Sequence, residues 1–316
     1  MSSQSSTENS SGFPQSNWDL DYSRRRRAKR TQRKALRLVR VGLAIAFASV
    51  LMAPVLSGCE HEKPSIAKAA PRPEWRLIWS DEFNGDTLDR TKWKPRNWAE
   101  GLGWSGFEDS PETIQVRDGV LHILARPRGN RYISGLVETQ GLWHWHYGRF
   151  EARIKMAKGA GGTSAFWMMA ADPTPEPWPM FGEIDIAEQL GRKPNAFLSA
   201  LHYPNEPGGG DHKWFTSDKP LVDDFHVYRC DWTKDGFKFY IDGQLFHTIT
   251  KWNPSDPAIP ESPFHRNFFL ILDLHVGSDW GGGPNKSTQW PLDMQVDWVR
   301  VYSNEDPLPQ RKTHYE

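Results

Sequence analysis

Three carboxylic acids lie close together in the segment 181–189. Side chains alternate between the two faces of a β-strand, so Glu183 and Asp185 should share one face. Strict alternation would turn Glu188 toward the opposite, apolar face, where an unpaired carboxylate is costly. A β-bulge near residues 186–187 would add one residue and return Glu188 to the polar face. We therefore predict a bulged strand that presents three carboxylates on one open face.

The spacing of these acids limits the chemistry. Glu183 and Glu188 are about four strand steps apart, or roughly 13 Å between backbones at ~3.3 Å per step. Long side chains that lean together could bring the carboxyls to the ~5–5.5 Å separation at which a nucleophile and an acid/base retain configuration at a sugar. Asp185 between them should raise a neighbouring pKa and keep one glutamate protonated. A solvated acidic face or a Ca²⁺ site explains the same pattern, so spacing alone leaves all three interpretations open.

Short strands separated by turns account for the chain from Trp75 onward. Residues 150–156 alternate apolar and charged side chains, the pattern of a half-buried strand. Residues 237–249 have a hairpin pattern centred on Asp242–Gly243, a pair typical of a type I′ turn. Further strands are expected at Val120–Ala125, Ala196–Tyr203, Phe225–Trp232, Phe268–Val276 and Met294–Tyr302. Because no long helical pattern interrupts them, we predict an all-β domain of two packed sheets.

Motifs on both sides of the acids occur in the order found in one known family. The acids match Glu-[Ile/Leu/Val]-Asp-x-x-Glu in its bulged form, with Trp178–Pro179 before them. The other motifs are Leu77–Gly85, Gly191–Asn195, Leu201–Tyr203, Phe225–Trp232, Phe239–Gly243 and Met294–Tyr302. Together they resemble glycoside hydrolase family 16, and within it the laminarinase-like endo-β-1,3-glucanases, over about residues 74–302. The resemblance implies an antiparallel β-sandwich jelly roll (concanavalin-like) with a substrate cleft on its concave sheet.

The resemblance also implies roles for the three acids. Glu183 would be the nucleophile, Glu188 the acid/base, and Asp185 the group that holds the nucleophile's geometry and tunes its protonation. The implied reaction is retaining, endo-type hydrolysis of a β-glycan, foremost β-1,3-glucan, with no cofactor required for the chemistry. Hydrolysis of mixed-linkage glucan or of an agar- or carrageenan-type galactan, and transglycosylation, remain open. A non-catalytic carbohydrate-binding sandwich is a further alternative, although it would not need all three acids.

On the same resemblance, five further side chains are candidates for contact with substrate: Trp104, Trp167, Trp178, His202 and Trp280. A buried structural tryptophan, or a histidine satisfied in the core, is the alternative for each. Two segments depart from the laminarinase pattern, residues 107–111 and Ser134–Leu136, and both are expected on the substrate face. The identity of the glycan is therefore open.

One metal site is implied by the resemblance, a structural Ca²⁺ ion on the convex side. The matching positions are Glu82, Gly119 and Asp297, with two of the three ligands being backbone oxygens. Oxygen ligands suit Ca²⁺. We expect such an ion to stabilise the fold and to take no part in the chemistry.

Charge is unevenly distributed along the 316 residues. The 39 basic and 39 acidic side chains cancel, but residues 1–58 hold 10 basic against 3 acidic ones. The remaining chain has 29 basic and 36 acidic side chains, a net charge of about −7 with His neutral. Such an acidic domain argues against a nucleic-acid partner. The 16 tryptophans suit stacking on sugar rings, and we expect a monomer whose partner is a polysaccharide.

The N-terminal region resembles an export signal behind a polar extension. Residues 1–22 are rich in Ser, Asn and Gln and are expected to be disordered. A basic run at Arg24–Arg40 precedes an apolar run at Val41–Leu56, and Leu56–Cys59 resembles the lipobox of bacterial lipoproteins. We predict an exported protein held at the membrane of the bacterial cell envelope by a lipid on Cys59. An uncleaved transmembrane anchor is the alternative, although about sixteen apolar residues are short for a span.

These signals divide the chain into four parts. Residues 1–58 are the extension and signal, and residues 59–74, with three prolines, form a linker. Residues 75–303 are the family 16 catalytic domain, followed by a tail at 304–316. Cys230 would have no disulfide partner if the other cysteine carries a lipid, and its apolar strand face predicts a core thiol.

Overall fold

Strands form nearly all of the regular structure in the computed structural model, which describes residues 74–172, 178–204, 210–252 and 263–304. Within these ranges the one helical element is a short 3₁₀ turn, η1 at Leu221–Asp223. No helix in the described ranges is long and apolar enough to cross a membrane. The prediction of an all-β domain is confirmed. The predicted signal, Cys59, most of the linker and nearly all of the tail lie outside the described residues.

Seven strands form one sheet, in the order β13-β12-β11-β10-β17-β8-β2. All neighbours in it pair antiparallel. The bounds are β2 Lys94–Pro95, β8 Leu136–Glu138, β10 Gly162–Ala170, β11 Glu183–Leu190, β12 Ala196–His202, β13 Gly210–Thr216 and β17 Phe268–Val276. The strand that carries the three acids is β11, flanked by β10 and β12.

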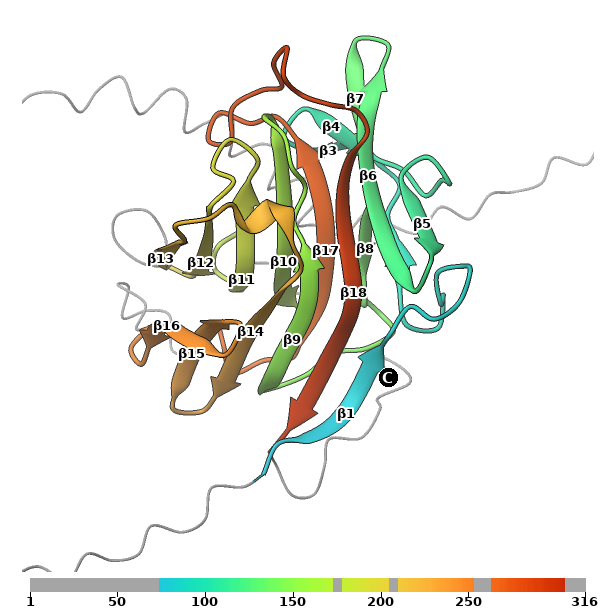
Figure 1. Cartoon of the computed structure of the whole chain (residues 1–316). Helices are drawn as coiled ribbons and strands as arrows, with labels where there is room; N and C mark the ends of the chain where they lie inside the picture. The colour runs from blue at the N-terminus through green and yellow to red at the C-terminus, as the bar shows by residue number, and fades with distance from the viewer. Residues whose placement is uncertain (1–73, 173–177, 205–209, 253–262, 305–316) are drawn as a thin grey trace, which may run out of the picture.

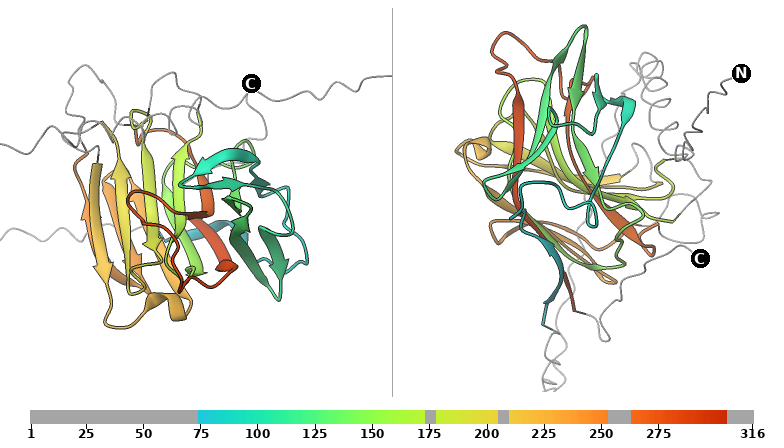
Figure 2. Two further views of the ribbon diagram at one scale, coloured as in Figure 1. Left: turned by 90° about the horizontal axis from the view of Figure 1, so that it is seen from above. Right: turned by 90° about the vertical axis from the view of Figure 1, so that its right-hand side faces the viewer.

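The second sheet has eleven strands in the main order β16-β15-β14-β9-β18-β6-β7-β4-β3, with β1 paired to β18 and β5 to β6. The pairing of β4 with β7 is parallel. The bounds are β1 Arg76–Asp81, β3 Trp98–Leu102, β4 Ser105–Phe107, β5 Ile114–Arg117, β6 Val120–Arg128, β7 Arg131–Ser134, β9 Gly148–Lys155, β14 His226–Thr233, β15 Gly236–Ile241, β16 Gln244–Ile249 and β18 Leu292–Ser303. Figures 1 and 2 show the two sheets as the layers of a sandwich.

The core lies between the two sheets and is built from alternate residues of their strands. Phe166 and Ile184 point inward from β10 and β11, and Phe150, Ile154 and Cys230 point inward from β9 and β14. Full burial of a large apolar side chain stabilises a fold by about 1.5–3 kcal/mol. The residues between them face away from the core, so each sheet also has an outer face.

The structure confirms two local predictions, the hairpin centred on Asp242–Gly243 and the core position of Cys230. The hairpin is β15 and β16, and the turn residues Asp242 and Gly243 have positive φ values of 48° and 80°. A type I′ turn requires positive φ at both positions. Cys230 is a fully buried free thiol, and burial raises its pKa, as expected for a core residue.

Candidate active site

The predicted bulge is present in β11. Along β12, Asp185 pairs with Ala200 and Glu188 pairs with Leu198, so three steps on β11 match two steps on its neighbour. Residues 186–187 both point into the core between the sheets. The extra residue restores the alternation and returns Glu188 to the outer face.

The three acids share the outer face of the seven-stranded sheet, which we call the carboxylate face. Glu183 and Asp185 are buried, 6% and 4% exposed, whereas Glu188 is partly exposed. Their partners on β10 are Met169, Trp167 and Ala165. These three belong to a second apolar cluster that is separate from the core and includes residues of β3 and β4. Two carboxyls are therefore sheltered from water and the third is accessible to it.

Trp178 and His202 contact two of these acids. The indole Nε1–H of Trp178 donates a hydrogen bond to Oε2 of Glu183 at 2.5 Å. His202 pairs with Glu183 across the β11–β12 ladder, and its Nε2 lies 2.9 Å from Oδ2 of Asp185. The rings of Trp178 and His202 are 5.5 Å apart. Both residues, predicted to contact substrate, thus lie within the acidic cluster itself.

Burial and mutual charge set the protonation of this cluster. Loss of water, and then the charge of Asp185, raises the pKa of Glu183 to about 8, against the opposing effects of His202 and Trp178. Burial alone would lower the pKa of His202, but the three surrounding carboxyls outweigh it and raise that pKa to about 9. At neutral pH the imidazole is therefore charged. The raised pKa of Glu183 keeps its carboxyl largely protonated at neutral pH.

A metal ion was one alternative for an acidic cluster of this kind. Glu183, Asp185 and His202 offer ligand-type atoms that all lie within 4.8 Å of one another. A protonated imidazole, however, has two N–H donors and no lone pair for a metal. Because the pKa of His202 is raised to about 9, its own positive charge balances the carboxyls near neutral pH.

Two exposed tryptophans border the carboxylate face where β17 ends, on the side nearest Glu188. Trp104 is 50% exposed, and its backbone N–H donates to the carbonyl oxygen of Val276 at 2.7 Å. A Cβ added at Gly277 or Gly283 would lie 2.3 or 2.4 Å from its ring, so the indole packs directly on these glycines. Trp280, in the same connection, is 37% exposed. Both indoles are accessible for the predicted stacking on sugar.

A third aromatic residue of this region, Trp214, was not predicted from the sequence. On β13 it pairs with Leu198, which pairs with Glu188, so all three lie on the carboxylate face. Its ring is 5.9 Å from that of Trp280, and Nζ of Lys193 lies 3.9 Å from its centre. Only the register with β12 places Trp214 here, and register is not visible in one strand's sequence.

Trp167 is buried on the carboxylate face, where it pairs with Asp185 across β10 and β11. It is 4% exposed, and its Nε1–H donates to Oδ1 of Asp273 at 2.9 Å. Nδ1 of His275 lies 2.9 Å from the other carboxylate oxygen of Asp273. The structure therefore favours the alternative of a buried tryptophan, which packs against a polar pair. Two polar residues inside the otherwise apolar β17 were the sequence signal for this pair.

Two of the three residues predicted to bind calcium, Glu82 and Asp297, have side chains engaged in ion pairs, and Gly119 lies in an open turn with a positive φ of 74°. Asp297 accepts a hydrogen bond from Nη1 of Arg153 at 2.6 Å. Both carboxylate oxygens of Glu82 accept from Arg300, at 3.0 and 2.8 Å. Calcium would have to share the Asp297 carboxylate with a guanidinium, so this side chain suits a divalent cation poorly. The structural Ca²⁺ ion stays a prediction.

Comparison with known proteins assigns the domain to a family. The family model for the GH16 domain of β-porphyranases A–D matches residues 75–304. The chain belongs to glycoside hydrolase family 16. The recognition made from the motifs is thereby confirmed, and the enzymes of this family are retaining O-glycosyl hydrolases.

Similar proteins include enzymes that act on glucans. Glucan endo-1,3-β-glucosidase A1 of Niallia circulans is 35% identical over 264 residues, which cover 72% of this chain and 38% of that protein. The β-glucanase of Rhodothermus marinus is 32% identical over 271 residues, 78% of this chain and 91% of that protein. The catalytic domain of an endo-1,3-β-glucanase (laminarinase) from Thermotoga petrophila RKU-1 superposes with a TM-score of 0.66 at 29% identity, over 74% of this chain and 100% of that one. The family 16 jelly-roll fold is confirmed.

Proposed function

We propose that this family 16 domain is a retaining endo-hydrolase of β-1,3-linked glucan. The bulge in β11 carries the proposal, because it gathers Glu183, Asp185 and Glu188 on one face of the sheet. The substrate is proposed from the relatives, which include a glucan endo-1,3-β-glucosidase and a laminarinase.

In the first step, a carboxylate oxygen of Glu183 attacks the anomeric carbon as the bond to the leaving oxygen breaks. Glu188 gives its proton to that oxygen, and a glycosyl ester forms on Glu183. Attack requires the ionised form of Glu183. The Trp178 N–H and the charged imidazole of His202 favour this ionised form, because each lowers the pKa of Glu183.

In the second step, Glu188 takes a proton from water, and the water oxygen attacks the anomeric carbon. Glu183 leaves as a carboxylate, which the Trp178 N–H and the charged His202 stabilise. Two displacements at the same carbon restore the β configuration of the substrate.

The test is the digestion of laminarin by the purified protein, with the products followed by NMR from the first minutes. We expect β anomers first and oligosaccharides of several lengths. Early α anomers would contradict the role of Glu183 as nucleophile. No release of reducing ends from any β-1,3-glucan would contradict the substrate.

A β-linked galactan is the second candidate substrate, because the matching family model is that of β-porphyranases. The segments that depart from the laminarinase pattern contribute Phe107 and Leu136 to the apolar cluster on the carboxylate face. Reducing-sugar release from agarose and carrageenan, measured beside laminarin and mixed-linkage glucan, separates the two candidates.

We also propose that the protein is lipid-anchored in the cell envelope through Cys59. The support is the Leu-Ser-Gly-Cys sequence behind a basic and an apolar run. Cys59→Ala should release or mislocalise the protein. Unchanged membrane fractionation with an intact N-terminal segment would instead favour a transmembrane anchor.

A further inference from the structure

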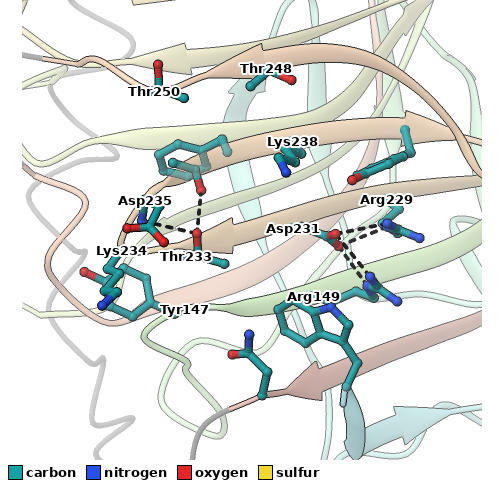
Figure 3. Close-up of a pocket in the computed structure, with 15 residues that line it drawn as sticks. Tyr147, Arg149, Arg229, Asp231, Thr233, Lys234, Asp235, Lys238, Thr248 and Thr250 are labelled. Carbon is teal, nitrogen blue, oxygen red and sulfur yellow. Dashed lines mark hydrogen bonds and ion pairs between the residues drawn. The ribbon is translucent and has the colours of Figure 1, made fainter. Parts of the chain in front are cut away.

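A cavity of about 840 Å³ lies on the outer face of the eleven-stranded sheet (Figure 3). Its lining comes from β9, β14, β15 and β16, together with Trp75 and Asn304 near the two ends of the described domain. The core separates it from the carboxylate face, because its residues alternate with the inward-pointing Phe150, Cys230 and Phe239. Cavities of this size accommodate small ligands, and a ligand here would not compete for the three acids.

An arginine–aspartate–arginine cluster forms part of the wall. Asp231 accepts hydrogen bonds from Nε and Nη2 of Arg149 at 2.8 and 3.1 Å, and from Nη2 of Arg229 at 3.0 Å (Figure 3). Paired contacts of this kind fix the orientation of a guanidinium. Glu151, outside the lining, is 3.8 Å from Nη1 of Arg229. The cluster therefore offers two oriented arginines that share one close carboxylate.

The lining is basic, although the domain around it is acidic. Its charged side chains are Arg149, Arg229, Lys234 and Lys238 against Asp231 and Asp235. The side chains of Lys234 and Lys238 are exposed, and within the described ranges neither side-chain amine forms a hydrogen bond or an ion pair. A local excess of positive charge attracts anions, most strongly at low salt.

Aromatic rings and hydroxyls lie beside these charges. The guanidinium of Arg229 is 3.7 Å from the centre of the Tyr240 ring, and that of Arg149 is 4.8 Å from the Trp75 ring. Thr248 and Thr250 also line the cavity. Rings with an apolar body and a polar edge, next to hydroxyls, suit the mixed surface of a sugar.

We propose that this cavity is a second, non-catalytic glycan site, which binds an oligosaccharide carrying sulfate or carboxylate groups. The anionic group contacts Lys234 and Lys238, and the sugar rings pack beside Tyr240 and Trp75. Binding here is independent of which glycan is cleaved at the acids.

The test is titration calorimetry in a Glu183→Gln background, which stops hydrolysis. The probes are sulfated carrageenan oligosaccharides and neutral agarose oligosaccharides of equal length. We expect the sulfated probe to bind more tightly, with an affinity that falls as salt rises. Adding Lys234→Glu and Lys238→Glu should weaken its binding at least tenfold, by roughly 1.4 kcal/mol. Lys219→Glu, a charge reversal at an exposed lysine outside the cavity, should leave it unchanged.

The same two lysine changes, made with Glu183 intact, should not alter the hydrolysis of soluble laminarin. Undiminished binding of the sulfated probe by the double variant would overturn the proposal. Equal affinity for the neutral probe would do the same. Failure of the unmodified protein to cleave laminarin counts against the proposed function only, because the binding experiments do not depend on it.

Discussion

Replacing Glu183 with glutamine should stabilise the domain while it removes the proposed nucleophile. The carboxyl titrates near 4.5 in an unfolded chain and near 8 in the native one. Between these values the native state holds more protons, so its stability falls as pH rises through this window. Glutamine cannot ionise, and its side-chain oxygen can still accept the Trp178 N–H. The stability of the glutamine variant therefore does not fall through ionisation at this position as pH rises.

The magnitude follows from the shift. Between pH 4.5 and pH 7 the native state loses about 3 kcal/mol of stability through Glu183, at roughly 1.36 kcal/mol per pH unit. His202 has the opposite linkage, since its raised pKa adds stability that is lost as pH rises through about 9, and Glu183 supports that charge. We therefore expect a net gain of about 1–2 kcal/mol, or ~3–6 °C in Tm for a domain of this size.

Thermal unfolding of both proteins from pH 4.5 to pH 8 measures this gain. The difference in Tm should be near zero at pH 4.5 and grow toward pH 8. Glu188→Gln is the matched control, with little change expected because Glu188 is partly exposed. If Glu183→Gln melts at or below the unmodified protein at pH 8, then Glu183 is held as a well-stabilised carboxylate and the reasoning is wrong.

Three further predictions concern binding and catalysis. Trp178→Phe removes a hydrogen bond that lowers the pKa of Glu183, so the acidic limb of the kcat/KM profile should move to higher pH. If that limb does not move, Trp178 has no influence on the ionisation of the nucleophile. Trp104→Ala should raise KM about 3–10-fold at constant Tm, as expected for ~0.5–1.5 kcal/mol of ring contact. Trp167→Ala, at a buried position, should instead cost about 3–5 kcal/mol of stability. The reverse pattern in KM and Tm would make Trp167 the substrate contact and Trp104 the structural residue. Glu183→Ala should regain turnover with azide and give the inverted product, while Glu188→Ala should lose more activity on poor leaving groups than on activated aryl glycosides; equal losses on both would deny Glu188 the acid role.

Strand positions could be predicted from the sequence because alternation and turn chemistry are local. Residues 268–276 form a strand with the expected bounds, and the Asp242–Gly243 turn has the expected backbone. The bulge in β11 was predictable for an energetic reason, since strict alternation would have buried Glu188 among apolar groups. Local signals and one desolvation cost were thus enough to place the acids on one face.

Contacts between strands could not be predicted in this way, because they depend on register. Trp214 reaches the carboxylate face only through its pairing with β12. The indole N–H of Trp167 donates to Asp273, which is also in contact with His275. The sequence alone could not decide whether Trp167 is a core residue or a substrate contact. The cavity on the other sheet joins residues from both ends of the domain, so no single segment reveals it.

The pairing of β1 with β18 brings the two ends of the domain together, with Arg76 opposite Ser303 (Figure 1). Trp75 and Asn304 both line the cavity on the side away from the acids. Termini so close could be joined by a short peptide, and a circular permutant opened at a loop elsewhere should fold. Adjacent termini also allow the domain to be joined to other segments as a single folding unit. Both ends of the described domain, at Trp75 and Asn304, therefore lie on the side opposite the carboxylate face, so a segment fused at either end would be attached away from the three acids.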